Sequence, residues 1–408
     1  MNEDTSVVGC KLVTGVALSG ARIFWGWFHF GWRGPHGGAR KVSSMIRKKL
    51  WFGVAAIALI ATCLSVHSGY GQGTSDIARS ASTLRELAEQ RGIRIGAAAN
   101  PSHLNEPAYS TILGSEFDGL EPENAMKFAL LHPRPDTDTK PYDFAAADEL
   151  VAFAKKHNMA VRGHTLVWHR QIPDWVTKSN YAPQQLNNIL RSHIKAVLAH
   201  FGESVYAYDV VNEAFEDDGS MRRTPWYDQP GIGFAGQGTK YIEQALLWAH
   251  AANPKAKLFY NDYDVELVNK KSEAMYRMAA EFVRRGVPLN GVGLQMHIDL
   301  GFDDPAKLRS LVQNMERFAK LGLEVHITEL DIALSSNDAA NLDKQAKLYG
   351  EIARACIEQP ACKVLQTWGF TDKYSWIPNA RKGFGWALPW GVDFQKKPAY
   401  GAIAASMR

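Results

Sequence analysis

The feature that most constrains the fold is an alternation of short apolar, β-rich runs with helical segments between residues 93 and 371. The apolar runs cover residues 93–99, 117–121, 160–168, 205–212, 257–263, 292–298, 324–332 and 364–371. Between them, apolar residues recur at helical spacing in segments 145–156, 184–201, 241–252, 273–285, 305–321 and 342–358.

Several of the runs are apolar along their whole length, as strands buried on both faces of a parallel sheet are. Eight such strands alternating with helices predict an α/β fold, the (β/α)8 or TIM barrel, in a single domain. The competing fold is an open doubly wound sheet, which needs a glycine-rich phosphate-binding turn after its first strand. Here the first strand ends in Gly96-Ala-Ala-Ala-Asn100, without such a turn.

The basic surplus of the chain lies in its first 71 residues. The whole chain has 46 Lys and Arg against 42 Asp and Glu, a net charge of +4. Residues 1–71 contain eight of the basic and two of the acidic residues, which leaves 38 basic and 40 acidic residues in 72–408. A nearly neutral body argues against a phosphate-neutralising surface, and therefore against a nucleic acid as partner.

Residues 45–71 have the pattern of a secretory signal peptide. A basic stretch at 47–49 is followed by an apolar run at 50–64, which is too short to span a bilayer comfortably, and small residues lie near position 71. The pattern predicts an exported protein, secreted or periplasmic, with no stable membrane partner.

Residues 1–44 precede this pattern without clear periodicity. We interpret them as an upstream extension arising from a misassigned start, with translation beginning at Met45. The alternatives are an uncleaved anchor or a lipid attached to Cys63. Under this interpretation the exported domain comprises residues 72–408.

Two of the four cysteines, Cys356 and Cys362, fall in the exported domain, at the end of a predicted helix. Export permits a disulfide. The short spacing predicts a bond between these two cysteines, and the alternative is two free buried thiols.

Polar and aromatic side chains collect where the predicted strands end. They lie at residues 121–127, 164–171, 209–213, 261–262, 295–297, 326–331 and 366–368. Carboxylates at the inner ends of buried strands are costly without partners. In barrels of this kind the carboxyl ends of the strands form the rim that carries the active site. The pattern therefore predicts an enzyme.

Two carboxylates, Glu213 and Glu329, close the fourth and seventh strands, and barrel closure brings both to one mouth. Glycoside hydrolysis needs such a pair, because one group protonates the leaving oxygen while the other attacks the sugar or activates water. These two glutamates could also bind a metal with Asp331, His164 and His297, but no His-Glu-x-x-His spacing is present. A Gly-x-Ser-x-Gly nucleophile motif is absent as well.

Six motifs, each at a predicted strand end, form a specific signal. They are Glu-Asn-Ala-Met-Lys at 123–127, Gly-His-Thr-Leu-Val-Trp-His at 163–169, Asp-Val-Val-Asn-Glu at 209–213, Gly-Val-Gly-Leu-Gln-Met-His at 291–297, Ile-Thr-Glu-Leu-Asp at 327–331, and Trp-Gly-Phe-Thr-Asp at 368–372 with Ser-Trp at 375–376. With these motifs the chain closely resembles the endo-xylanases of glycoside hydrolase family 10, from about residue 92 to residue 400.

The resemblance implies a retaining endo-1,4-β-xylanase that cleaves internal bonds of xylan through a covalent glycosyl-enzyme intermediate. Glu213 would be the acid/base and Glu329 the nucleophile, with the two carboxyl groups ~5–5.5 Å apart, as retention requires. Asn212 would bind the sugar 2-hydroxyl. His297 would bond to Glu329, and Asp331 would in turn support His297.

The same resemblance implies a set of substrate-binding residues around these groups, namely Glu123, Asn124, Lys127, His164, Trp168, Gln171, Gln295, Trp368 and Trp376. It implies xylan and xylo-oligosaccharides as partners and no nucleotide, flavin or metal cofactor. We expect a monomer. We interpret His169 and His326 as structural histidines.

The chain departs from the usual family pattern at four positions, which are Asp118, Glu121, Phe128 and Tyr208. Glu121, for example, stands where the family often has Thr. Two other functions remain open: a hydrolase of the same fold acting on β-1,4-glucan, and a secreted glycan-binding protein without catalysis. The second would be expected to have lost a carboxylate or His297, and all are present.

Overall fold

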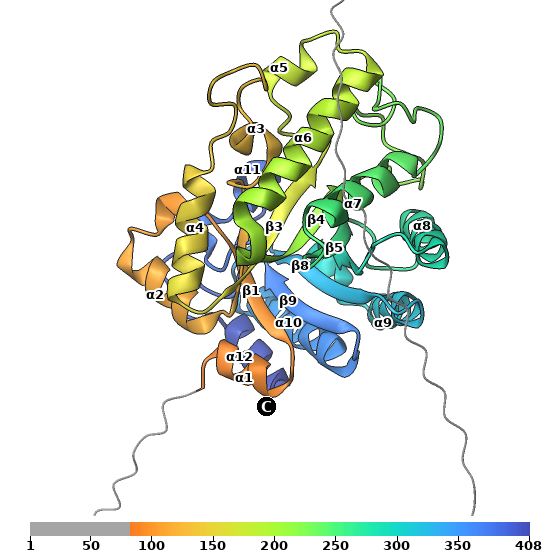
Figure 1. The fold of residues 1–408 in the computed structure, drawn as a ribbon. Coiled ribbons are helices and arrows are strands. Elements are labelled where there is room, and N and C mark those ends of the chain that lie inside the picture. Colours follow the sequence, from red (N-terminus) through yellow and green to blue (C-terminus); the bar gives the residue numbers. More distant parts are fainter. Residues whose placement is uncertain (1–81) are drawn as a thin grey trace, which may run out of the picture. The chain divides into compact units, whose positions relative to one another are not determined.

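The computed structural model describes residues 82–408, which form a barrel of parallel strands surrounded by helices (Figure 1). The upstream extension and the signal peptide predicted from the sequence, residues 1–71, lie outside the described residues. The strands are β1 (Arg94–Ala99), β2 (Gly119–Pro122), β3 (Ala160–Val167), β4 (Val205–Asn212), β5 (Lys257–Asp262), β6 (Gly291–Leu294), β7 (His297–Asp299), β8 (Glu324–Ala333) and β9 (Cys362–Thr367).

Eight of these strands close into a ring. Strands β1 to β6 pair in sequence order, β6 pairs with β8, β8 with β9, and β9 with β1, always in parallel. The predicted (β/α)8 barrel is therefore confirmed. Because every strand has a neighbour on both sides, the carboxyl ends of all eight strands meet at one rim.

The longer helices pack around the barrel and bury one apolar face each. They are α4 (Ala145–Lys156), α6 (Pro183–Phe201), α7 (Lys240–Ala252), α8 (Lys270–Arg285), α9 (Pro305–Lys320) and α10 (Ala339–Glu358). In α6, the residues Leu186, Leu190, Ile194, Val197 and Leu198 recur at helical spacing and are buried. No helix in the described part of the chain is long and apolar enough to cross a membrane.

The ends of these helices carry recognisable capping chemistry. Asn269 accepts a hydrogen bond from the Ser272 N–H at the start of α8, and Gly286 ends that helix in the left-handed region, with a φ of 71°. Asp304 caps α9 by accepting from the Ala306 N–H at 2.7 Å. Helix α9 begins at the predicted residue 305, whereas α8 and α10, capped by Asn269 and Asp338, begin before the predicted starts at 273 and 342 because apolar periodicity alone does not mark the first turn.

Several short elements lacked a clear apolar period and were not predicted. They are α1 (Leu84–Gln90), α2 (Pro107–Glu116), α3 (Phe128–Leu131), α5 (Asp174–Thr177), α11 (Ile377–Ala380) and α12 (Pro398–Ser406). A capping box between Thr83 and Glu86 marks the start of α1.

The prediction of one continuous sixth strand over residues 292–298 is wrong. Strand β6 ends at Leu294, and β7 begins at His297 and pairs with β8, with His297 opposite Asp331. Between them Met296 adopts a φ of 67°, and its N–H donates to the buried Glu266 carboxylate at 2.8 Å. This break turns the chain so that His297 faces the end of β8.

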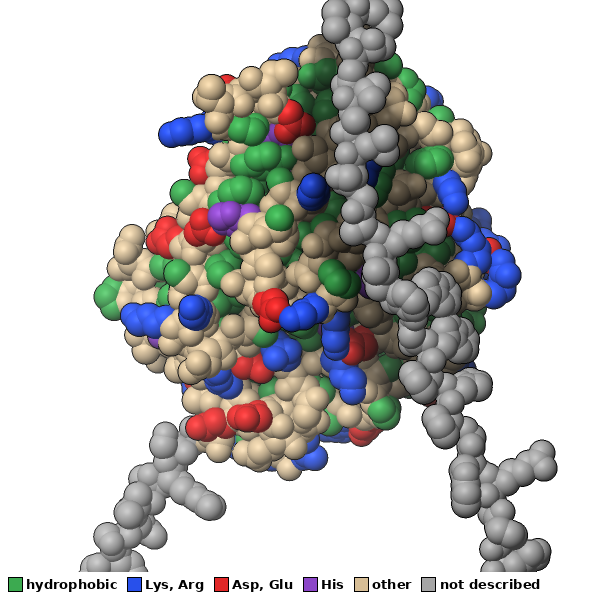
Figure 2. Space-filling view, in the orientation of Figure 1, with side chains coloured by type: hydrophobic (Ala, Val, Ile, Leu, Met, Phe, Trp, Pro, Cys, Tyr) green, Lys and Arg blue, Asp and Glu red, His purple; other side chains and the backbone are tan. Residues whose placement is uncertain are grey.

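Cys356, on α10, and Cys362, at the start of β9, are joined by a disulfide, in agreement with the prediction from the sequence. On the face of the molecule shown in Figure 2, basic and acidic side chains are interspersed rather than gathered by sign. This distribution matches the near-neutral charge of residues 72–408.

Candidate active site

A cleft of about 480 Å³ opens at the carboxyl ends of the barrel strands. The predicted catalytic and substrate-binding residues all line it, with the exception of Asp331, which lies behind His297. Five further residues line the cleft that the sequence did not single out as binding groups: His169, Arg170, Arg222, Tyr263 and Asp264.

Glu213 follows β4 with its backbone in the left-handed region, at a φ of 56°. This conformation costs a non-glycine residue about 1–3 kcal/mol, so the surroundings must hold it. The Glu213 N–H donates to the Asn261 carbonyl at 2.9 Å, and the Arg222 side chain donates to the Glu213 carbonyl at 2.9 Å. In this conformation the Glu213 side chain lines the cleft.

The Glu213 carboxylate accepts bonds on both oxygens. The Trp168 indole N–H donates to Oε2 at 2.8 Å, and the Gln295 amide donates to Oε1 at 3.1 Å. His169 Nδ1 lies 3.7 Å from Oε2. His169, which we interpreted from the sequence as a structural histidine, thus lines the cleft with its ring beside the Glu213 carboxylate.

Glu329 lies on β8 with only 4% of its surface exposed. His297 Nε2 contacts its Oε2 at 3.0 Å, and the Asn261 amide donates to its Oε1 at 2.8 Å. Burial by itself raises the pKa of Glu329, but the bond from His297, the neighbouring His164 and the bond from Asn261 together hold that pKa below its usual value. The side chain is thus kept as an anion.

A second row of bonds fixes His297. Its Nδ1 lies 2.8 Å from Asp331 Oδ2, and the Trp376 indole N–H donates to the same oxygen at 2.8 Å. Burial would lower the pKa of His297, but Asp331 and Glu329 raise it well above 6.5. The ring is therefore an imidazolium held between two carboxylates, which donates a charge-assisted hydrogen bond to Glu329.

Asn261, at the end of β5, connects the two halves of the site and was missed as a site residue in the sequence. Its amide donates to Asn212 Oδ1 at 2.9 Å as well as to Glu329, and its Oδ1 accepts from the Thr328 hydroxyl at 2.8 Å. Glycine at position 293 leaves the space that the Asn261 side chain occupies, because a Cβ there would lie 2.0 Å from Asn261 Oδ1. The only sequence signal for Asn261 is its place at a strand end, in the row that contains Asn212 and Glu213.

A polar cluster lies at the side of the cleft formed by the segment after β2. The amide oxygen of Asn124 accepts from Lys127 at 3.1 Å and from Gln171 at 3.0 Å, and the Asn124 amide donates to Glu123 at 3.2 Å. Lys127 Nζ lies 4.8 Å from the centre of the Trp168 ring. Burial lowers the pKa of Lys127, against the opposing effect of nearby carboxylates. Hydrogen-bond donors and acceptors beside aromatic rings suit a sugar, which has polar edges and C–H faces.

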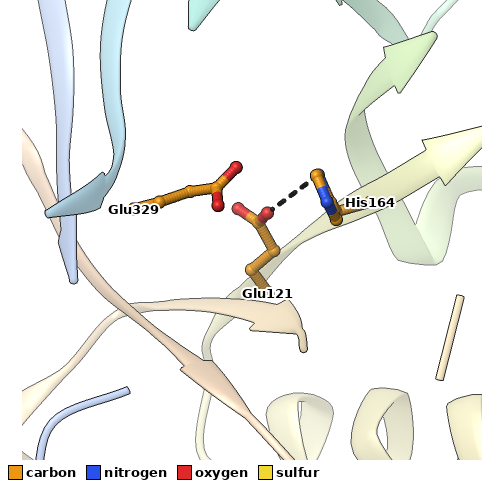
Figure 3. Close-up of side chains that lie close together, drawn as sticks. All are labelled: Glu121, His164 and Glu329. Carbon is orange, nitrogen blue, oxygen red and sulfur yellow. Dashed lines mark ion pairs between the residues drawn. The ribbon is translucent and has the colours of Figure 1, made fainter. Parts of the chain in front are cut away.

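Among the described residues, one group of side chains lies close enough to hold a metal ion: Glu121, His164 and Glu329, whose candidate ligand atoms lie within 4.8 Å of one another (Figure 3). The chemistry of the site does not fit a cation. The Arg162 guanidinium lies 3.7 Å from Glu121, and His164 Nδ1 already bonds Asp209 at 3.0 Å. We therefore assign no metal to these residues.

Comparisons with known proteins agree with this geometry. A family model described as glycosyl hydrolase family 10 matches residues 83–406. The endo-1,4-beta-xylanase B of Thermotoga neapolitana is 42% identical over 329 residues, an alignment that covers 79% of this chain and 91% of that protein.

Solved structures give the same result. Native xylanase 10B from Thermotoga maritima is 43% identical, with a TM-score of 0.74, over 80% of this chain and 98% of that one. Xylanase 10B from Thermotoga petrophila RKU-1, solved in complex with xylobiose, is 42% identical with a TM-score of 0.74, over 80% and 97% of the two chains. By the extent of the family match and the identity to these relatives, the chain belongs to glycosyl hydrolase family 10.

Proposed function

We propose that the protein is a retaining endo-1,4-β-xylanase in which Glu329 is the nucleophile and Glu213 the acid/base. The observation that carries this assignment is the contrast between two carboxyl groups in one cleft. Glu329 is held ionised by the His297 imidazolium and by Asn261. Glu213 instead receives neutral donors, Trp168 and Gln295, and faces the cleft.

The geometry supports a double displacement. Glu329 attacks the anomeric carbon and forms a bond to it, while the bond between that carbon and the glycosidic oxygen breaks and Glu213 gives its proton to that oxygen, so that the sugar on the far side leaves as an alcohol. In the second step Glu213 takes a proton from water, the water oxygen attacks the anomeric carbon, and Glu329 leaves. Asn212, held by Asn261 and Gln295, is placed between the two carboxylates to bind the 2-hydroxyl.

Xylan is the substrate favoured by the relatives. The Thermotoga neapolitana protein is named for this activity, and the Thermotoga petrophila structure contains xylobiose, a fragment of xylan. The retention of both carboxylates and of His297 argues against a protein that only binds glycans.

The experiment is release of reducing sugar from xylan by the wild type and by Glu213→Gln and Glu329→Gln. Glu281→Gln, the same substitution on the exposed surface of α8, is the matched control and should keep full activity. Activity that collapses in the two site variants and not in the control supports the proposal. A folded wild type without activity on xylan would overturn it.

Azide rescue separates the two roles. Removal of an acid/base leaves turnover of activated aryl xylosides, because a good leaving group needs no proton, and azide then gives a β-xylosyl azide from the covalent intermediate. We expect this product from Glu213→Ala and an α-xylosyl azide from Glu329→Ala. The reverse pairing would exchange the assigned roles.

We further propose that the chain is exported through the signal peptide at residues 45–71 and acts as a monomer outside the cytoplasm. The sequence pattern and the Cys356–Cys362 disulfide support export. Sequencing of the N-terminus after expression in a bacterial host should find cleavage near residue 71, and light scattering should give the mass of one chain. An uncut N-terminus would exclude the cleaved signal peptide, and a larger mass would exclude the monomer.

A further inference from the structure

A further carboxyl group, that of Glu121, lies close to Glu329. It is at the end of β2, is fully buried, and does not line the cleft. Figure 3 shows its side chain directed toward Glu329 from β8 and His164 from β3. A carboxylate oxygen of Glu121 lies within 4.8 Å of one from Glu329.

The basic groups beside Glu121, Arg162 at 3.7 Å and His164 at 3.3 Å, are both bonded to Asp209. The Arg162 guanidinium bonds Asp209 through two nitrogens, and its third nitrogen contacts His326 at 2.8 Å. His164 Nδ1 is 3.3 Å from Glu121 Oε1 but directs its bond to Asp209. Within residues 82–408, Glu121 Oε1 has no hydrogen-bond partner, while its Oε2 accepts from the neutral Gln366 amide.

The charges that face Glu121 do not support a second anion. The ionisable groups packed against it are Arg162 and His164 from β3, Asp209 from β4, Glu329 from β8, and Lys127 from the segment after β2. Strand β9 contributes only the neutral Gln366. Asp209 already neutralises Arg162, so ionised Glu121 and Glu329 would form a buried pair of like charges.

Two buried carboxylates this close do not both ionise at the same pH, and the one with the weaker partners keeps its proton. The partners of Glu329 are an imidazolium and the Asn261 amide. Burial and the neighbouring Asp209 raise the pKa of Glu121 well above its usual value, in agreement with this ranking.

We propose that Glu121 is a positioning residue that holds a proton beneath the nucleophile, so that Glu329 is the only anion of this pair in the working enzyme. Loss of this proton at alkaline pH then slows attack by Glu329. The inference rests on the proposed role of Glu329 as nucleophile. An ionised Glu121 would repel the Glu329 carboxylate from its bonds to His297 and Asn261.

The first test locates the proton by infrared spectroscopy of the wild type and Glu121→Gln. The difference spectrum at neutral pH should contain the carbonyl stretch of a protonated carboxyl group, and this band should disappear as the pH is raised. In Glu329→Gln, which leaves Glu121 intact, the band should be lost at a pH ~1–2 units lower, because the like charge is gone. A carboxylate band from Glu121 at neutral pH in the wild type would overturn the proposal.

The second test measures kcat/KM against pH on a dinitrophenyl β-xylobioside, whose leaving group needs no proton from Glu213. The wild type should lose activity at alkaline pH, and Glu121→Gln should move this loss upward by ~1 pH unit or more. Glu213→Gln should show the alkaline loss at the wild-type position. Coincident profiles for the wild type and Glu121→Gln, or loss of the alkaline limb in Glu213→Gln, would refute the proposal.

The infrared comparison requires no turnover. It therefore decides where the proton lies even if the xylan assay of the proposed function fails, and a failure of one proposal can be told from a failure of the other.

Discussion

The contact between Asp331 and His297 offers a sharp test of how the nucleophile is held. Asp331 Oδ2 lies 2.8 Å from His297 Nδ1 and has no contact with Glu329 itself. Opposite unit charges ~4 Å apart interact by about 4 kcal/mol at an effective dielectric constant of ~20. Loss of the Asp331 charge should therefore lower the pKa of His297.

The perturbation is Asp331→Asn, which keeps the size of the side chain. An amide oxygen can still accept from Trp376, so the amide NH2 would face His297 Nδ1 and hold the ring neutral, with Nε2–H donating to Glu329. The bond to Glu329 then loses its charge assistance. This loss of free energy is about half of the ~1.5–3 kcal/mol typical of hydrogen bonds to charged groups, and it corresponds to a ~10-fold fall in kcat/KM.

The same change has a defined effect on the pH profile. In the wild type the His297 imidazolium lowers the pKa of Glu329, so Glu329 remains ionised when the pH falls. Without that charge the pKa of Glu329 rises, so Glu329 becomes protonated and inactive at a higher pH. The acid limb of kcat/KM on xylo-oligosaccharides should therefore move upward by ~1 pH unit.

The matched control is Asp299→Asn, on the same short strand β7. Asp299 pairs with Arg381 at 2.8 Å and is about one-third exposed, and it does not contact His297 or Glu329. It should leave the acid limb in place. An Asp331→Asn protein that is folded and has both the wild-type acid limb and the wild-type kcat/KM would refute the argument that the His297 charge holds Glu329 ionised.

Three further predictions follow from other contacts. Asn261→Ala removes a hydrogen bond of 2.8 Å to Glu329 and should lower kcat/KM on xylo-oligosaccharides ~10–100-fold, and an unchanged value in a folded variant would contradict the bridging role. Replacing Cys356 and Cys362 together by Ser opens a loop with a sequence separation of 6, which should cost about 2 kcal/mol and lower Tm by several degrees in calorimetry, whereas an unchanged Tm would show that the bond does not stabilise the fold. Burial lowers the pKa of His326 to about 4. The unfolded chain therefore binds a proton at this residue below pH 6.5, whereas the folded chain binds it only below about pH 4. Stability against urea should therefore fall by up to ~3 kcal/mol as the pH drops through this window, and His326→Asn should reduce that fall; an equal fall in the variant would exclude His326 as the cause.

Much of the fold could be predicted from the sequence because its signals are local. A strand buried on both faces must be apolar throughout, and a packed helix must show its 3.6-residue period, so eight alternations pointed directly to a barrel. Segments with weak periodicity escaped prediction. The break at Met296 escaped as well, because a left-handed φ held by Glu266 leaves no trace in an apolar run.

The composition of the site was also largely determined by the sequence. Barrel closure brings all strand ends to one rim, so the residue types found there could be assigned to one cleft before any distance was known. Glu213, Glu329 and the residues of the polar cluster at Asn124 all lie in it.

Only the tertiary structure decided which of these groups touch. Asn261 bridges Asn212 and Glu329, and Glu121 lies beneath Glu329 beside basic groups that bond Asp209, although these residues are on different strands. Contacts across a barrel depend on the relative heights of the strands and on side-chain packing, which no local pattern encodes. The sequence therefore named the groups that carry out the chemistry, and the packing of the strands determined their charges and their partners.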